Sequence, residues 1–163
     1  MTKFSCYHTI SGNIISTFCQ LSEKCYSNST KLLAITYDQL LIPELDRSLW
    51  TFAKIKYIPH ATNCDPMPEL QPIYITDKLE NPNQAEVIIF INASKQMILD
   101  LMIGEKEIKA SDFKRIIFLF DNNSEIIYEE VVELITKSPI TNYDLECFKQ
   151  EIKGNWQKIE KVT

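Results

Sequence analysis

"AEVIIFI", residues 85–91, and "KRIIFLF", residues 114–120, decide the fold of this chain. Each is a short, nearly continuous apolar run rich in isoleucine and phenylalanine, which is typical of a strand covered on both faces. Such strands lie at the centre of parallel sheets, between two layers of helices. The two stretches therefore predict central strands of an α/β sheet.

The residues before these strands alternate between strand and helix patterns. The expected order is a strand at 3–9, a helix from 14 to 25, a strand at 31–37 and a helix from 40 to about 50. Ser11-Gly12-Asn13 supplies turn and cap chemistry for the first helix, and Asp38 can cap the second. Parallel strands joined by helices need right-handed crossovers, so helices are expected on both faces of a mostly parallel, Rossmann-like sheet.

The remaining segments complete one predicted domain that spans residues 1–163. Prolines and polar residues make residues 61–83 an extended surface excursion, which a strand at 72–77 interrupts. A helix is expected from 123 to about 137, capped by Asn122, Asn123 or Ser124. A closing hairpin is expected, with strands at 143–150 and 155–159 joined through Lys153-Gly154.

Charge and composition exclude several classes of protein. The 17 basic and 22 acidic side chains give a net charge of −5, so the chain as a whole repels a phosphate backbone and direct nucleic-acid binding should be weak or absent. No run approaches the roughly 20 apolar residues that span a bilayer. The beginning of the chain lacks a signal-peptide pattern, which favours a cytoplasmic location.

Catalytic and metal sites find little support in the residue pattern. The glycines stand alone, at positions 12, 104 and 154, and form no phosphate-binding loop. The five cysteines contain no C-x-x-C pair. A zinc site would have to combine Cys6 and His8 with His60 and Cys64. A thiol hydrolase would use Cys64, His60 and Asp65, and a nucleotide site without the usual loop is a further alternative.

Aromatic residues gather in "LDRSLWTFAKIKYIPH", residues 45–60, where a predicted helix gives way to a loop. Trp50, Phe52 and Tyr57 could pack in the core, but they stand beside Lys54 and Lys56. Aromatic and basic side chains together are typical of protein interfaces. We therefore predict a partner-binding surface formed by Trp50, Phe52 and Tyr57.

These residues also carry a resemblance to a known family. The stretch 45–60, then "QPIYITD", "NPNQAEVIIFIN", "RIIFLFDNN" and "CFKQEIKGNWQK", resembles in order and spacing the chi subunit of bacterial DNA polymerase III. The similarity covers essentially the whole chain, and the Phe148-x-Gln150 and Gly154-x-Trp156 patterns resemble the α-proteobacterial type.

The resemblance implies a replication accessory protein of the clamp-loader assembly, with an α/β fold and no nucleotide site or cofactor. Such a protein is a non-catalytic subunit of a DNA-directed DNA polymerase, a nucleotidyltransferase holoenzyme. In the family, chi docks on the psi subunit and also binds the acidic C-terminal tail of single-stranded DNA-binding protein. The family's partner-binding aromatic residues fall on Trp50 and Tyr57, and another loader subunit could replace psi.

One departure concerns the late helix, where the family's best-studied members place basic residues that receive the acidic tail. This chain instead has four glutamates there, Glu125, Glu129, Glu130 and Glu133. A substitute basic site could come from Lys106, Lys109, Lys114 and Arg115, although the pattern favours a solvated edge.

Overall fold

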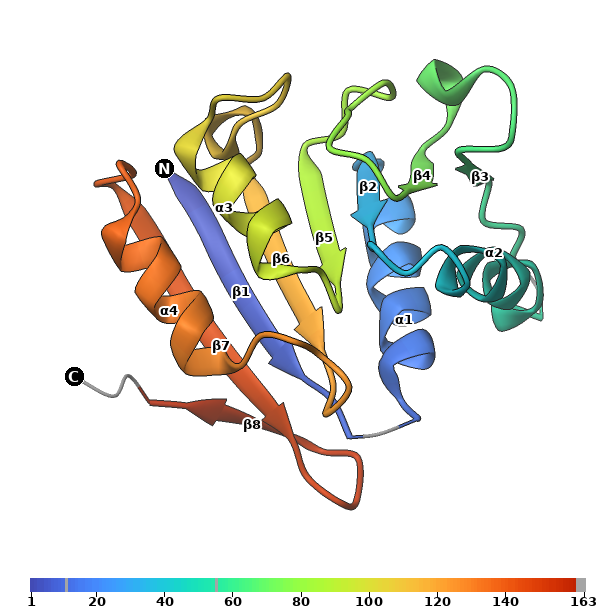
Figure 1. Cartoon of the computed structure of the whole chain (residues 1–163). Coiled ribbons are helices and arrows are strands. Elements are labelled where there is room, and N and C mark those ends of the chain that lie inside the picture. The colour runs from blue at the N-terminus through green and yellow to red at the C-terminus, as the bar shows by residue number, and fades with distance from the viewer. Residues whose placement is uncertain (11, 55, 161–163) are drawn as a thin grey trace.

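The computed structural model describes residues 1–10, 12–54 and 56–160 as a single eight-stranded sheet with helices on both faces (Figure 1). The strand order is β3-β4-β2-β5-β6-β1-β7-β8. The neighbouring strands pair in parallel except β7 and β8, which form an antiparallel hairpin. The strands are β1 (Thr2–His8), β2 (Leu32–Ile35), β3 (Ala61–Thr62), β4 (Ile73–Thr76), β5 (Val87–Ile91), β6 (Arg115–Phe120), β7 (Tyr143–Gln150) and β8 (Trp156–Ile159).

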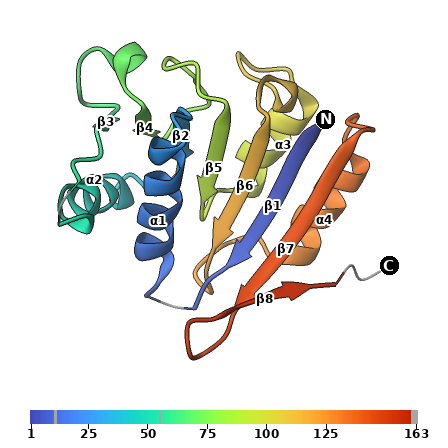
Figure 2. The same ribbon diagram turned by 180° about the vertical axis from the view of Figure 1, so that it is seen from behind.

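Two helices cover each face of the sheet. Helices α1 (Ile14–Ser27) and α2 (Leu41–Phe52) pack on one face, and α3 (Lys95–Ile103) and α4 (Tyr128–Lys137) pack on the other. Figure 2 shows the molecule from behind, where α1 crosses the sheet and no helix passes in front of β1, β7 and β8. Within the residues described, no helix is long and apolar enough to cross a membrane.

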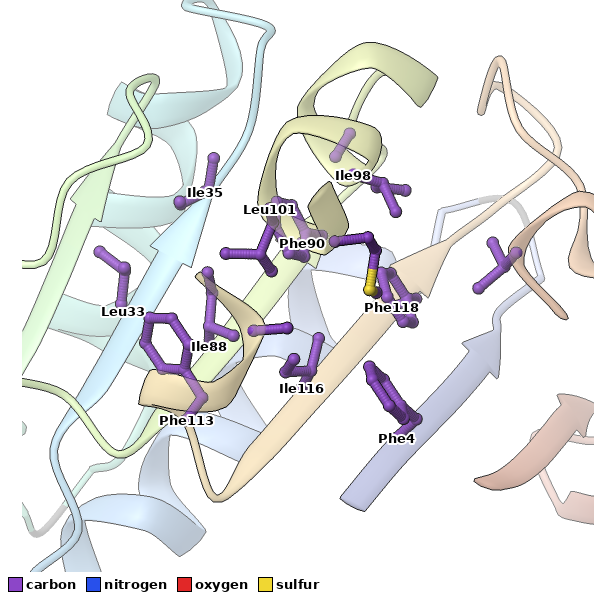
Figure 3. Close-up of a cluster of buried hydrophobic side chains, with 14 of the residues drawn as sticks. Phe4, Leu33, Ile35, Ile88, Phe90, Ile98, Leu101, Phe113, Ile116 and Phe118 are labelled. Carbon is purple, nitrogen blue, oxygen red and sulfur yellow. The ribbon is translucent and has the colours of Figure 1, made fainter. Parts of the chain in front are cut away.

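The apolar centre of the sheet confirms the prediction made from residues 85–91 and 114–120. Alternate side chains of β5 and β6 enter the two cores, one under each helix layer, and most are fully buried. On the α3 and α4 side, Phe4, Phe90 and Phe118 lie side by side from three adjacent strands (Figure 3). The Phe118 ring centroid is 6.3 Å from that of Phe4 and 5.7 Å from that of Phe90.

The late helix begins later than the sequence predicted, at Tyr128 in place of Asn123. The polar residues before it form a turn instead of a cap: Asp121 Oδ1 accepts a hydrogen bond from Asn123 N, and Ser124 N donates to Asp121 O. Such local hydrogen bonds compete with helix formation. The helix is stabilised at its beginning by Glu130, whose Oε2 accepts from Ile127 N at 3.1 Å.

Three other local features can be compared with the sequence predictions. Asn13 donates its side-chain N–H to Gln150 and does not cap α1, and Ser11 lies outside the described residues. The strand predicted at 72–77 is confirmed as β4, which is buried between β2 and β3. Helix α3 was not predicted, although Ser94, which caps it, and Gly104, which ends it at a φ of 74°, are ordinary helix boundary signals.

The Phe-x-Gln and Gly-x-Trp patterns of the closing hairpin have a structural basis. Gln150 Oε1 accepts from Ile10 N at 3.2 Å, and its amide donates to Gly154 O at 3.2 Å. Phe148 stacks on Tyr7 with 5.2 Å between ring centroids, and Trp156 meets the same ring edge-on at 5.4 Å. These contacts fasten the hairpin to β1 and to the loop that follows it.

An ion-pair cluster on the same hairpin predicts a pH dependence of stability. Glu146 lies 2.7 Å from Lys3 Nζ and 3.0 Å from Lys158 Nζ, and hydrogen bonds from Lys3 and then Lys158 lower the pKa of Glu146 to about 2. Because this value lies below the unfolded-state value of about 4.3, the cluster stabilises the fold fully above about pH 5. That contribution is lost as the pH falls from about 5 to about 2.

We therefore expect Glu146→Gln to lower the free energy of unfolding by about 1 kcal/mol at pH 7, the upper range for exposed ion pairs. The difference from the natural chain should shrink steadily in urea unfolding experiments between pH 5 and pH 2.5. Glu151→Gln, at an exposed hairpin position, is the matched control. A Glu146→Gln deficit that stays constant with pH would rule out the ion-pair origin.

Candidate partner-binding surface

The surface begins at the last turn of α2, where the helical spacing separates buried from exposed residues. Leu45 and Leu49 point into the core and are at most 2% exposed. Trp50 follows Leu49 by about 100° around the helix, so its side chain leaves the core and is 56% exposed. Just before the helix begins, Asp38 Oδ1 accepts a hydrogen bond from Leu40 N at 3.0 Å. The sequence thus places a tryptophan on the exposed side of a helix whose buried side consists of Ile42, Leu45 and Leu49.

The chain then returns alongside α2 and brings a second ring to the first. Ile58 is fully buried and anchors the returning segment, whereas the neighbouring Tyr57 is 57% exposed. The ring centroids of Trp50 and Tyr57 are 5.1 Å apart, with the planes tilted by 35°. Two large rings that both face outward therefore form one continuous apolar surface.

His60 connects the returning segment to the helix beneath these rings. Its Nδ1 lies 2.7 Å from Ile58 O, and its Nε2 lies 3.1 Å from both the backbone oxygen and Oδ1 of Asp46. The Trp50 ring meets the buried imidazole edge-on, with 5.1 Å between centroids. Asp46 and His60 thereby fix the position of Trp50, so the surface is held in shape before any partner arrives.

Phe52 does not belong to the exposed ring pair. It is partly buried and packs against the core on the α1 and α2 side. Lys54 and Lys56 are exposed and lie between Trp50 and Tyr57 in the sequence, and Ile55 between them lies outside the described residues. The structure therefore brings together Trp50 and Tyr57 and turns Phe52 toward the core.

Removal of the His60 side chain should loosen this arrangement. We expect His60→Ala to lower the free energy of unfolding by about 2 kcal/mol, because buried hydrogen-bond acceptors are left without a donor and a cavity remains. Urea unfolding followed by circular dichroism measures the stability. His8→Ala is the control, since His8 is less buried and its side chain has one hydrogen-bond partner, Asn122. Equal losses in the two variants would contradict the role given to His60.

The residues considered for a thiol site do not assemble. Both ring nitrogens of His60 are occupied by oxygens of Ile58 and Asp46, and the Cys64 Sγ instead contacts Asn63 Oδ1 at 3.7 Å. Asp65 accepts hydrogen bonds from the backbone N–H and the hydroxyl of Thr62. A nucleophile, its base and an orienting acid must be in mutual contact, and here each has a different partner.

The residues considered for zinc are also separated by their contacts. Cys6 is buried beside Cys147, its partner position on the adjacent strand, and the hydrogen bond between the two thiols raises the pKa of Cys6. His8 contacts Asn122. Across the part of the chain that the structure describes, no group of three or more His, Cys, Asp or Glu side chains is placed to hold a metal ion.

The carboxyl edge of the sheet, where α/β folds bind nucleotides, has the wrong charge for phosphate groups. A cavity of about 420 Å³ lies there between the ends of the strands and the beginning of α1 and α2. Asp38, Glu44 and Asp121 are among its lining residues. Carboxylates at this position repel phosphates, so the geometry does not favour a nucleotide.

Of the four glutamates expected on the late helix, three lie on α4, and two of these three form ion pairs with lysines. Glu125 lies before the helix and accepts a hydrogen bond from Tyr37 OH at 3.3 Å. Glu130 pairs with Lys95 at 3.4 Å, and Glu133 pairs with Lys137. Glu129 remains on this surface at the beginning of the helix.

The proposed substitute basic cluster is divided between the two faces of the sheet. Lys114 forms an ion pair with Glu86 at 2.6 Å. Lys109 lies against Gly104 at the end of α3, whereas Arg115 reaches toward α1 on the opposite face and donates to Ser5 and Tyr7. These side chains therefore do not form one patch.

The fold and this surface define a Rossmann-like α/β protein that presents two exposed aromatic rings in a fixed arrangement. Comparison with known proteins gives the family. Residues 1–130 match the family model described as "DNA polymerase III chi subunit, HolC". The chain is also 37% identical over 162 residues to the "Probable DNA polymerase III subunit chi" of Rickettsia prowazekii (strain Madrid E), with 98% of this chain and 93% of that protein covered.

The chain therefore belongs to the DNA polymerase III chi subunit family, and the similarity to an α-proteobacterial member agrees with the type that the sequence indicated. This membership assigns it to DNA replication, as an accessory subunit of a bacterial DNA polymerase III.

Proposed function

We propose that this chain is a non-catalytic interaction module that connects the clamp loader of DNA polymerase III to single-stranded DNA-binding protein. The observation that carries the proposal is the pair of rings at Trp50 and Tyr57, which are more than half exposed and yet held in place by His60. Burial of two such side chains contributes on the order of 3 to 6 kcal/mol, at about 1.5 to 3 kcal/mol each, before the cost of association.

The chemistry of the surface indicates what the docking partner presents. An apolar side chain would cover Trp50 and Tyr57, and acidic groups at the rim would face Lys54 and Lys56. Phe52, which packs against the core, becomes part of the interface only at its edge. The partner is psi or the loader subunit that takes its place.

The tail of single-stranded DNA-binding protein is the second proposed partner, and the charges on this chain make it the weaker one. A cavity of about 340 Å³ lies between the beginning of α4 and the β7–β8 hairpin. Lys149 is its one lysine, and Asp121 and Glu129 line the same cavity. An acidic tail would gain one favourable charge contact there against two unfavourable ones.

Affinity capture from the organism's own extract tests the proposal. The tagged full-length chain should retain clamp-loader subunits, identified by mass spectrometry, and a smaller amount of single-stranded DNA-binding protein. Tyr57→Ala should lower the loader signal without changing the second signal, whereas Leu40→Ala, at an exposed leucine just before α2, should change neither. Capture that lacks every polymerase III component would overturn the proposed function.

A further inference from the structure

A third cavity lies on the α1 side of the sheet, and neither Trp50 nor Tyr57 lines it. It has a volume of about 130 Å³ and is enclosed by the last turns of α1 and by the strands β5, β6 and β1. Two of its lining residues, Lys24 and Arg115, are cationic, and none is acidic. Tyr7, Asn28 and Thr30 add polar groups to its wall. A cationic cavity is unexpected in a chain with a net charge of −5.

Arg115 is held toward this cavity by hydroxyl groups. Its Nε and Nη2 donate to Ser5 Oγ at 3.3 and 3.1 Å, and Nη2 also donates to Tyr7 OH at 3.2 Å. The side chain is half-buried. A guanidinium carries five N–H groups on three nitrogens. The contacts to Ser5 and Tyr7 involve Nε and Nη2, so the N–H groups of Nη1 are available to another acceptor.

Neither cation has a counter-ion within the described part of the chain. Over the residues that the structure describes, neither Arg115 nor Lys24 comes within 4.0 Å of a carboxylate, although five lysines do. Arg115 is half-buried, and removing a charge from water is costly unless an opposite charge or good acceptors replace the water. The cavity therefore has the charge of an anion site whose negative partner comes from outside the chain.

We propose that this cavity binds an oxyanion of the size of a phosphate group, held by Arg115 and Lys24. A volume of about 130 Å³ is sufficient for a phosphate or carboxylate group. Arg115 supplies a directed charge, Lys24 closes the site from α1, and Asn28 and Thr30 supply neutral polar groups.

The surroundings of Cys25 support the position of both charges. Burial raises the pKa of the Cys25 thiol, and the nearby Arg115 and Lys24 act against that rise. The charges of Arg115 and Lys24 thus both act on the Cys25 thiol, which lines the cavity. The site does not depend on the docking surface, because Trp50 and Tyr57 belong to α2 and the segment that follows it.

An NMR titration of the full-length chain with inorganic phosphate, at constant ionic strength, tests the site. Amide signals of residues 24, 28 and 30 should shift and saturate. Arg115→Gln should weaken the apparent affinity at least tenfold, whereas Lys114→Gln removes the same charge from the adjacent exposed position and should change the affinity less than twofold. Lys24→Gln, at an exposed helix position, provides a second test if Arg115→Gln does not fold.

The outcomes separate the two chemical sources of an oxyanion. Saturation with phosphate alone identifies a phosphate group as the ligand, and saturation with acetate alone identifies a carboxylate. Either result supports the proposed site. Shifts that do not saturate with either anion, or that are equal in the natural chain and in Arg115→Gln and Lys24→Gln, would overturn the proposal.

Discussion

Replacing Trp50 with alanine is expected to weaken binding of the chain to its clamp-loader partner by at least about thirtyfold. This corresponds to roughly 2 kcal/mol, the value that marks a dominant residue of an interface. Trp50 is more than half exposed, so its removal takes away contact area for the partner and little of the protein core. Isothermal titration calorimetry with the purified partner subunit measures the change.

The matched control is Tyr37→Ala, which removes another exposed ring at a different place. Tyr37 is 42% exposed and hydrogen-bonds to Glu125. Its loss should change the affinity less than threefold. Both variants should keep the circular dichroism spectrum of the natural chain. Equal affinities for Trp50→Ala and the natural chain would exclude Trp50 from the interface.

The largest expected effect on stability is at the centre of the sheet. Phe118→Ala should lower the free energy of unfolding by about 3 to 5 kcal/mol, because the removed ring leaves a cavity between Phe4 and Phe90 that strands on both sides prevent from closing. Urea unfolding measures the loss. Ile152→Ala is the control at an apolar residue that is 94% exposed, and it should stay within about 0.5 kcal/mol of the natural chain.

A Phe118→Ala loss below about 1 kcal/mol would mean that this ring is not in the core. Such a result would also question the parallel register that places β6 between β5 and β1.

The central strands could be predicted from the sequence because their signal is local. A short run of isoleucine and phenylalanine is typical of a strand that is covered on both faces, and β5 and β6 are such strands. The beginning of α4 could not be predicted in the same way. Asp121 and Ser124 can either cap a helix or form a turn, and the sequence alone does not decide between them.

The candidate surface was predicted in part. Trp50 and Tyr57 stand out because large aromatic residues occur beside lysines. The Phe52 side chain points toward the core because of its angular position on α2 and because of the path of the next segment. That path depends on tertiary contacts. The role of His60 was missed for the same reason, since Asp46 lies 14 positions earlier and meets it only after the chain has reversed.

Arg115 illustrates a further limit of sequence reading. In the sequence it stands next to Lys114 and near Lys109, and the three residues appear to form a basic cluster. In a strand, however, neighbouring side chains point to opposite faces, so Arg115 turns toward α1 while Lys114 pairs with Glu86. The second positive charge at the cavity, beside that of Arg115, comes from Lys24, 91 positions away in the sequence.

Site-specific photocrosslinking provides the most direct test of docking through the Trp50 and Tyr57 surface. A photoreactive phenylalanine analogue would replace Tyr57 in the full-length chain, and a second sample would carry it at Tyr37. After irradiation in the organism's own extract, the chain modified at position 57 is predicted to crosslink to a clamp-loader subunit, and the chain modified at position 37 is not. Crosslinks to loader subunits from position 37 alone, or from neither position while the fold is intact, would contradict docking through this surface.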